Sequence, residues 1–137
     1  MTPHRRLRIM CVDDNPLITS SLQRRIAHEA SLDWVGSSNG AGDLTSQIVE
    51  ARPDVLLLDV DMPGIDTFAL VEQLGTSAPD LRVAMLSGHV EPAYVTRAID
   101  AGAWGYLSKN DDVSALIAGI HAIARGELVL SPDVKTR

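Results

Sequence analysis

The sequence lacks the features of a secreted, membrane-spanning or nucleic-acid-binding chain. It has one cysteine, so no disulfide forms within the chain. No apolar run approaches the roughly 20 residues that cross a bilayer, and residues 9–12 are too few for the core of a signal peptide. Acidic residues outnumber basic ones by 18 to 12, whereas a surface that grips DNA or RNA is basic. We therefore expect a cytoplasmic protein with no membrane contact, in which this segment does not itself hold nucleic acid.

Two further scarcities narrow the chemistry and the architecture. No cluster of cysteine and histidine is present, which disfavours a zinc site. Cys11 lies inside an apolar run, which is typical of a small buried side chain rather than of a reactive thiol. The 137 residues contain no internal repeat, low-complexity tract or interior linker, so we expect one domain around one core.

The chain does contain a regular alternation of strand-like and helix-like segments. Short apolar runs predict strands at residues 7–12, 34–36, 55–59, 82–86 and 104–107. Apolar residues at helical spacing predict helices near residues 16–30, 44–51, 68–74, 92–101 and 113–125. We expect Asn15 to cap the first helix with Pro16 at its first position, and residues 75–79 to end the third.

This alternation predicts an α/β fold in which a parallel sheet carries helices on both faces, because parallel strands need right-handed crossover connections. An eight-unit barrel would need about twice this length. We therefore expect an open doubly wound sheet of five parallel strands in the order 2-1-3-4-5 with five helices, which is a flavodoxin-like architecture.

Polar residues follow these strands at their carboxyl ends, where functional groups gather in such sheets. They are Asp13 and Asp14 after the first strand, Asp59 at the end of the third, Ser87 after the fourth and Lys109 just past the fifth. Taken singly, they read as a helix cap, a polar strand end, a turn hydroxyl and a surface lysine. Together they bring three carboxylates into one site, and a like-charged pair about 4 Å apart costs on the order of 4 kcal/mol at an effective dielectric of 20. Such a site needs cations.

Lys109 supplies one of these cations, and a hard divalent ion such as Mg²⁺ supplies the other through carboxylates and water. The chemistry that this combination favours is phosphoryl transfer to a carboxylate, with Asp59 as the nucleophile. Ser87 is then placed to donate a hydrogen bond to a bound phosphoryl oxygen.

Four motifs carry these residues: Asp13-Asp14, residues 58–64 (Leu-Asp-Val-Asp-Met-Pro-Gly), Ser87-Gly88, and residues 105–109 (Gly-Tyr-Leu-Ser-Lys). Together they resemble the signature positions of response-regulator receiver domains of two-component signalling. The resemblance covers nearly the whole chain, from about Leu7 to Arg125. It implies that Asp59 is the phosphoacceptor and that a sensor histidine kinase or a phosphotransfer protein supplies the phosphoryl group.

The resemblance also assigns the metal site and the switch. It implies that Asp13, Asp14, Asp59 and the backbone carbonyl of Asp61 hold Mg²⁺, and that Lys109 pairs with the phosphoryl group. Ser87 and Tyr106 match the switch pair of the family, in which the hydroxyl moves toward the phosphate and the aromatic ring turns inward. The face formed by the fourth helix, the fifth strand and the fifth helix then changes its partners and forms a homodimer. The chain assists only its own phosphorylation and autodephosphorylation.

The sequence departs from the family pattern in a few places. Thr67 stands where the family often has glycine, and Asn110 stands where proline often follows the lysine. Asp61 and His89 occupy positions that vary in the family, and we expect their side chains to tune the lifetime of the phosphoryl group by orienting water.

The tail indicates a subfamily. Residues 109–111 and 124–132 resemble regulators that continue into a linker and a LuxR/NarL-type helix-turn-helix domain. We expect a receiver domain over residues 1–127 and a tail or linker over 128–137, with DNA contacted only through an output domain outside this chain. A stand-alone receiver is the alternative.

The sequence leaves two rival functions open. One is a receiver-like interaction module that is not phosphorylated. The other is a phosphatase of the haloacid-dehalogenase type, because Asp59-Val60-Asp61 fits the Asp-x-Asp motif of that class. In that class the metal-binding acids follow the motif, whereas Asp13 and Asp14 precede it here.

Overall fold

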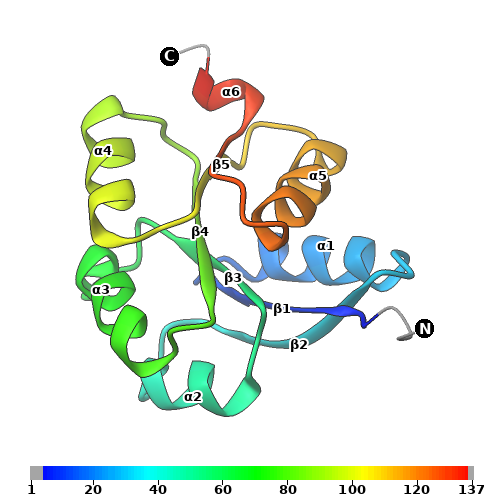
Figure 1. The fold of residues 1–137 in the computed structure, drawn as a ribbon, viewed down its shortest axis with the longest axis horizontal. Coiled ribbons are helices and arrows are strands. Elements are labelled where there is room, and N and C mark those ends of the chain that lie inside the picture. The colour runs from blue at the N-terminus through cyan, green and yellow to red at the C-terminus, as the bar shows by residue number, and fades with distance from the viewer. Residues whose placement is uncertain (1–4, 136–137) are drawn as a thin grey trace.

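The computed structural model describes residues 5–135 and shows one parallel sheet between two layers of helices (Figure 1). Within that range the sheet has six strands, in the order β2-β1-β3-β4-β5-β6. The strands are β1 (Leu7–Val12), β2 (Leu32–Ser38), β3 (Val55–Asp59), β4 (Arg82–Ser87), β5 (Gly105–Ser108) and β6 (Val129–Leu130). The helices are α1 (Pro16–Ala27), α2 (Leu44–Ala51), α3 (Thr67–Ser77), α4 (Pro92–Ala101), α5 (Val113–Ala124) and α6 (Pro132–Lys135). The α/β architecture and the order of the first five strands are confirmed, and a sixth strand and a sixth helix are added.

Two apolar clusters fill the space on either side of the sheet. Helices α1 and α5 cover one face, and α2, α3 and α4 cover the other (Figure 1). Successive residues of β3 alternate between the clusters, so that Val55 and Leu57 pack with α1 and α5 while Leu56 and Leu58 pack with α2, α3 and α4. Every residue of β3 is buried. Asp59 therefore meets open space only where the strand itself ends.

Short polar side chains begin most of the longer helices. The side chains of Asn15, Asp43, Asp66 and Asp112 each accept a hydrogen bond from a backbone N–H in the first turn of the helix that follows. The predicted start of α1 at Asn15 and Pro16 is confirmed. Gly102 ends α4 with a φ of 111°, a conformation that glycine adopts without strain.

Two element boundaries differ most from the sequence prediction. Strand β2 spans seven residues rather than three, because it lies at the edge of the sheet and pairs with β1 from Leu32 to Ser38 even where its side chains are polar. Helix α3 continues through Gly75 to Ser77, since a glycine inside a helix costs only about 1 kcal/mol. The helix is closed by the bond from the Ala78 N–H to the Leu74 carbonyl.

The tail segment, residues 128–135, folds back onto the sheet. Val129 and Leu130 pair in parallel with Gly105 and Tyr106, which makes β6 the outer neighbour of β5. Val134 in α6 is only 6% exposed. The tail segment thus lies against the domain, and a division of the chain at residue 127 stays a prediction.

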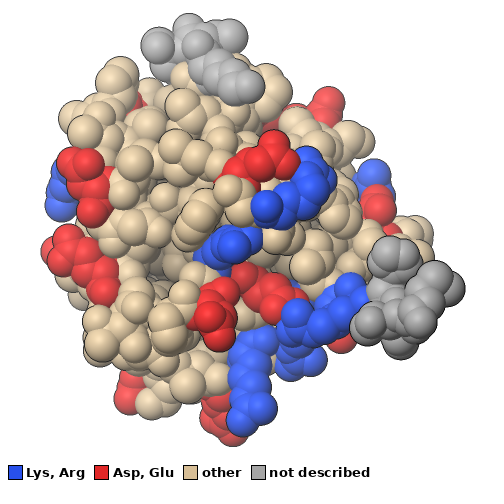
Figure 2. Space-filling model, viewed as in Figure 1, with Lys and Arg blue, Asp and Glu red and all other residues tan. Residues whose placement is uncertain are grey.

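The surface carries charges of both signs. On the face seen in Figure 2, basic side chains run in a band across the middle with acidic side chains beside them, so neither sign dominates that face. No helix within residues 5–135 is long and apolar enough to cross a membrane.

Candidate functional site

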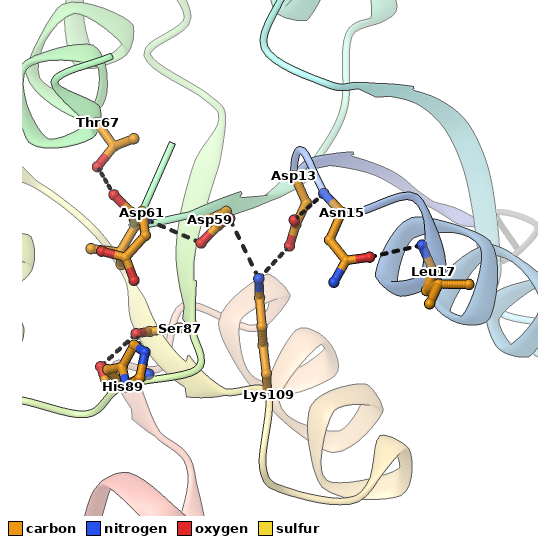
Figure 3. Close-up of polar contacts among 10 residues, drawn as sticks. Asp13, Asn15, Leu17, Asp59, Asp61, Thr67, Ser87, His89 and Lys109 are labelled. Carbon is orange, nitrogen blue, oxygen red and sulfur yellow. Dashed lines mark hydrogen bonds and ion pairs between the residues drawn. The ribbon is translucent and has the colours of Figure 1, made fainter. Parts of the chain in front are cut away.

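The site lies where β1, β3, β4 and β5 end (Figure 3). Asp59 is the last residue of β3 and Ser87 the last of β4, while Lys109 directly follows β5. Two backbone hydrogen bonds hold these ends together. The Val60 N–H donates to the Leu86 carbonyl over 3.0 Å, and the Lys109 N–H donates to the Ser87 carbonyl over 2.8 Å. The parallel sheet therefore brings residues far apart in sequence to one edge.

Three carboxylates meet there. Asp13, Asp14 and Asp59 each offer a carboxylate oxygen, and these oxygens lie within 4.8 Å of one another. Asp13 is 2% exposed and Asp59 is 3% exposed, whereas Asp14 is open to solvent. Backbone donors fix the two buried groups: the Asn15 N–H bonds Asp13 Oδ1 at 2.9 Å, and the Asp61 N–H bonds Asp59 Oδ1 at 3.0 Å (Figure 3). The positions of the buried carboxylates are thus set by the turns that follow β1 and β3.

Lys109 provides the positive charge of the site. Its Nζ lies 2.7 Å from Asp13 Oδ2 and 3.4 Å from Asp59 Oδ2. Burial alone would lower the pKa of Lys109, but its contacts with Asp13 and Asp59 outweigh burial and raise that pKa above its ordinary value. Within residues 5–135 no peptide bond is cis, so Lys109 and Asn110 are joined in trans.

For Asp59, burial has a larger effect on the pKa than the contacts that stabilise the charge. Burial, with help from the charge of Asp13, raises the pKa of Asp59, although the Asp61 N–H and Lys109 act to lower it. Three carboxylates beside one ammonium leave the site with a formal charge of −2 when all are ionised.

The donor set fits a hard divalent cation. All of the gathered ligand atoms are carboxylate oxygens, which Mg²⁺ prefers. Asp13 Oδ2 is buried and pairs with Lys109, but it accepts no hydrogen bond of standard geometry from the described residues. A bound cation would stabilise a buried carboxylate oxygen that lacks such a hydrogen bond. The side chain of Asp61 is exposed and is not part of this cluster.

Ser87 and Tyr106 lie on the β4 and β5 side of the site. The Ser87 hydroxyl donates to the His89 carbonyl and accepts from the His89 N–H, so it faces its own loop (Figure 3). The side chain of His89 is exposed, and only its backbone contacts Ser87. Tyr106 is fully buried, and its hydroxyl forms no hydrogen bond of standard geometry with the described residues. Burial raises the pKa of that phenol, and the nearby Ser87 hydroxyl opposes the rise.

One further side chain supports the site, although the sequence marks it only as a departure from the family pattern. Thr67 is buried, and its hydroxyl donates to the Val60 carbonyl over 3.0 Å (Figure 3). This bond ties the first residue of α3 to the turn that carries Asp61. The sequence signal was a hydroxyl residue directly after the capping residue Asp66.

Comparisons with known proteins agree on one family. The family model described as "Response regulator receiver domain" matches residues 9–121. The chain is 30% identical over 128 residues to the response regulator GacA of Pseudomonas aeruginosa, a match that covers 93% of this chain and 60% of that protein. It is also 30% identical to the transcriptional regulatory protein DegU of Brevibacillus brevis, covering 94% of this chain and 55% of that one. The chain thus spans little more than half the length of these relatives.

Solved structures give the same picture. A two-component response regulator of the LuxR family from Aurantimonas sp. SI85-9A1 superposes with a TM-score of 0.88 at 28% identity, covering 96% of this chain and 94% of that one. The signal receiver domain of the putative response regulator NarL from Mycobacterium tuberculosis superposes with a TM-score of 0.83 at 29% identity, covering 90% and 99% respectively.

Proposed function

Because the chain belongs to the family of response regulator receiver domains, we propose that it is a phosphorylation-controlled switch whose phosphoacceptor is Asp59. One observation carries the proposal: Lys109 Nζ lies within 3.4 Å of Asp59 Oδ2 in a site where three carboxylates converge. No other described acidic residues gather in this way. The Asp-x-Asp phosphatase reading loses its support, because Asp61 is exposed while Asp13 and Asp14 approach Asp59.

In the proposed reaction an oxygen of the Asp59 carboxylate forms a bond to the phosphorus of a phosphohistidine. The bond between phosphorus and the imidazole nitrogen of the donor breaks, and its electron pair leaves with the imidazole. The N–H of Asp61 holds Asp59 Oδ1, which leaves Oδ2 facing Lys109. The Lys109 ammonium then stabilises negative charge on the transferred group.

The residues that would hold Mg²⁺ are Asp13, Asp14, Asp59 and the backbone carbonyl of Asp61. When bound, the ion supplies positive charge against the carboxylates and the phosphoryl oxygens. Lys109 is the resident cation, and its ammonium lies against both Asp13 and Asp59.

The proposed switch starts from Ser87, whose hydroxyl leaves the His89 carbonyl to donate to a phosphoryl oxygen. Phosphorylation adds about −1.5 to −2 charges at one point. The face formed by α4, β5 and α5, including Tyr106, then changes its partners and forms a homodimer. We assign the side chains of Asp61 and His89 to tuning the phosphoryl lifetime, since both are exposed at the rim of the site.

The proposal extends to a wider setting, which is supported by the names of the relatives as response and transcriptional regulators. A sensor histidine kinase or a phosphotransfer protein supplies the phosphoryl group in the cytoplasm. An output domain of the LuxR/NarL type, outside this chain, contacts DNA. The chain catalyses only its own phosphorylation and autodephosphorylation.

A titration with beryllofluoride and Mg²⁺ tests the proposal, with amide NMR shifts of residues 59–61 and 87–89 as the readout. We expect saturable shifts that require both ions. Asp59→Asn keeps the shape of the side chain and should abolish them, whereas a response that survives in this variant would remove Asp59 as acceptor. A wild-type chain without any Mg²⁺-dependent response would be the unphosphorylated interaction module.

Labelling with an acyl phosphate gives a second, chemical readout. We expect intact mass to rise by one phosphoryl group per chain, and the label to be lost in Asp59→Asn. Exchanging both Asp61 and His89 for alanine should change the rate at which the label is lost. An unchanged rate would refute their tuning role and leave Asp59 as acceptor.

A further inference from the structure

The tail segment forms a polar network with the loop that carries Lys109. The Ser108 N–H donates to Ser131 Oγ over 3.1 Å, and the Ser108 hydroxyl donates to Asp133 Oδ2 over 2.6 Å. On the other side of Lys109, the Asn110 side-chain amide reaches the same Asp133 oxygen over 3.5 Å. Both sequence neighbours of Lys109 are therefore linked to the tail segment.

Backbone N–H groups of the tail segment also donate hydrogen bonds to β5 and to the loop that follows it. Asp111 accepts hydrogen bonds from the Asp133 N–H at 3.1 and 3.2 Å, and so holds the start of α6. The Ser131 N–H donates to the Tyr106 carbonyl over 3.2 Å. The two segments thus bond to each other through side chains and backbone groups of both.

Burial makes this network costly to break. Ser108 is fully buried and Ser131 is 2% exposed, so the loss of either partner would leave a buried polar group without a hydrogen bond. Leu130 and Val134 belong to the same apolar cluster as Tyr106. The tail segment therefore anchors the end of β5 by polar contacts and by apolar packing together.

Lys109 itself depends on where this loop lies. Its backbone N–H is fixed to the Ser87 carbonyl, and its side chain must cross to Asp13 and Asp59. A 2.7 Å ion pair with a buried carboxylate tolerates little displacement, because a buried charge that loses its partner is costly. Ser108 lies one residue away and takes its orientation from Ser131 and Asp133.

We propose that Ser131 and Asp133 are positioning residues for Lys109, so that docking of the tail segment and occupation of the phosphoacceptor site favour each other. The inference rests on the proposed function, because it concerns the same site. Thermodynamic reciprocity follows: if tail docking raises the affinity of the site for a phosphoryl mimic, the mimic must stabilise tail docking by the same factor. In a longer chain, a segment that follows the tail segment would then be attached directly to the residues that position Lys109.

Binding of beryllofluoride with Mg²⁺ to the full chain tests the proposal. We expect Ser131→Ala to weaken binding by about 2- to 10-fold, which is the range that one hydrogen bond supplies, and Ser131→Thr, which keeps the hydroxyl, to recover it. Asp133→Asn should weaken binding in the same range. Asp80→Asn, an exposed change at the opposite end of β4, is the matched control and should bind like the wild type.

A double-variant comparison separates positioning from general stabilisation. In a Lys109→Met background, Ser131→Ala should no longer change the affinity, because the residue it positions is gone. A Ser131→Ala effect of unchanged size in that background would overturn the proposal.

Amide hydrogen exchange on the wild-type chain needs no variant. Saturation with beryllofluoride and Mg²⁺ should slow exchange at Val129 and Ser131, and unchanged exchange there would refute the coupling. If the wild type binds the mimic while the tail variants bind equally well, only this inference fails. If the wild type does not bind it, the proposed function fails and this inference with it.

Discussion

Replacing Asp59 with asparagine should make the folded protein more stable at neutral pH. The change removes one of three clustered negative charges while keeping the size of the side chain. Its amide oxygen still accepts the bond from the Asp61 N–H. A residue placed for chemistry rather than for stability is expected to behave in this way.

The size of the gain follows from four terms. The repulsion between Asp59 and Asp13, whose oxygens lie no more than 4.8 Å apart, is at least about 3.5 kcal/mol at an effective dielectric of 20. The attraction to Lys109 over 3.4 Å is about 5 kcal/mol on the same scale. Asp14 adds repulsion that solvent screens, so the charge terms nearly cancel. Burial of the carboxylate then decides the sign, and we expect a net gain of about 1–2 kcal/mol.

The gain should depend on pH in a defined direction. Because the pKa of Asp59 is raised in the folded state, folded wild-type protein binds this proton more tightly than the unfolded chain does. The wild type is therefore penalised above the folded pKa, and the penalty disappears as pH falls toward 3.8, the ordinary value of the group. Wild type and Asp59→Asn should differ at pH 7 and converge in acid.

Thermal and urea unfolding without Mg²⁺ provide the assay. A gain of this size corresponds to a rise of about 3–8 °C in Tm for a domain of this length. Added Mg²⁺ should stabilise the wild type more than the variant, since the variant lacks one carboxylate ligand. Asp80→Asn controls for a change of net charge alone. A variant less stable than the wild type at pH 7, or a difference that persists in acid, would refute the reasoning.

Three other predictions concern groups around the site and the sheet. Burial raises the pKa of Cys11 to about 12, so its thiol should not react with a disulfide reagent near pH 8 until the chain unfolds, as followed by absorbance. Thr67→Val leaves the Val60 carbonyl without its buried partner, and should lower the free energy of unfolding by about 1–3 kcal/mol; it should also weaken Mg²⁺ binding, whereas Thr67→Ser should do neither. A methyl group at Gly105 would lie 2.6 Å from a side chain of α5 and 3.3 Å from a carbonyl of β6, so Gly105→Ala should cost about 1–3 kcal/mol in urea unfolding, while Gly36→Ala, with open space around it, serves as its control.

The convergence of Asp59 with Asp13 and Lys109 was predictable because it depends on local signals. Each of these residues follows a short apolar run, and parallel strands present their carboxyl ends at one edge. Both an apolar run that predicts a strand and the pair Asn15-Pro16 that predicts a helix start consist of consecutive residues, so a single sequence reveals them. The alternation of strands and helices was therefore sufficient to predict that these site residues lie together.

The contacts of the tail segment were not predictable in the same way. Val129 and Leu130 are too short a run to indicate a strand, and their partners on β5 are distant in sequence. The role of Ser131 depends on a buried N–H of Ser108, which no pattern of residue types reveals. The orientation of the Ser87 hydroxyl toward its own loop is likewise a choice among rotamers within one site.

Ser87 and Tyr106, the two residues of the proposed switch, are arranged differently in this structure, and the difference bears on how the proposed switch would work. Tyr106 is already buried, while the Ser87 hydroxyl still bonds the His89 carbonyl. If burial of the ring required Ser87 to move first, the two conditions would not occur together. Leu130 and Val134 supply a separate reason for the ring to stay inside, since they share its apolar cluster. Docking of the tail segment therefore helps to keep the Tyr106 ring buried while the Ser87 hydroxyl still faces its own loop.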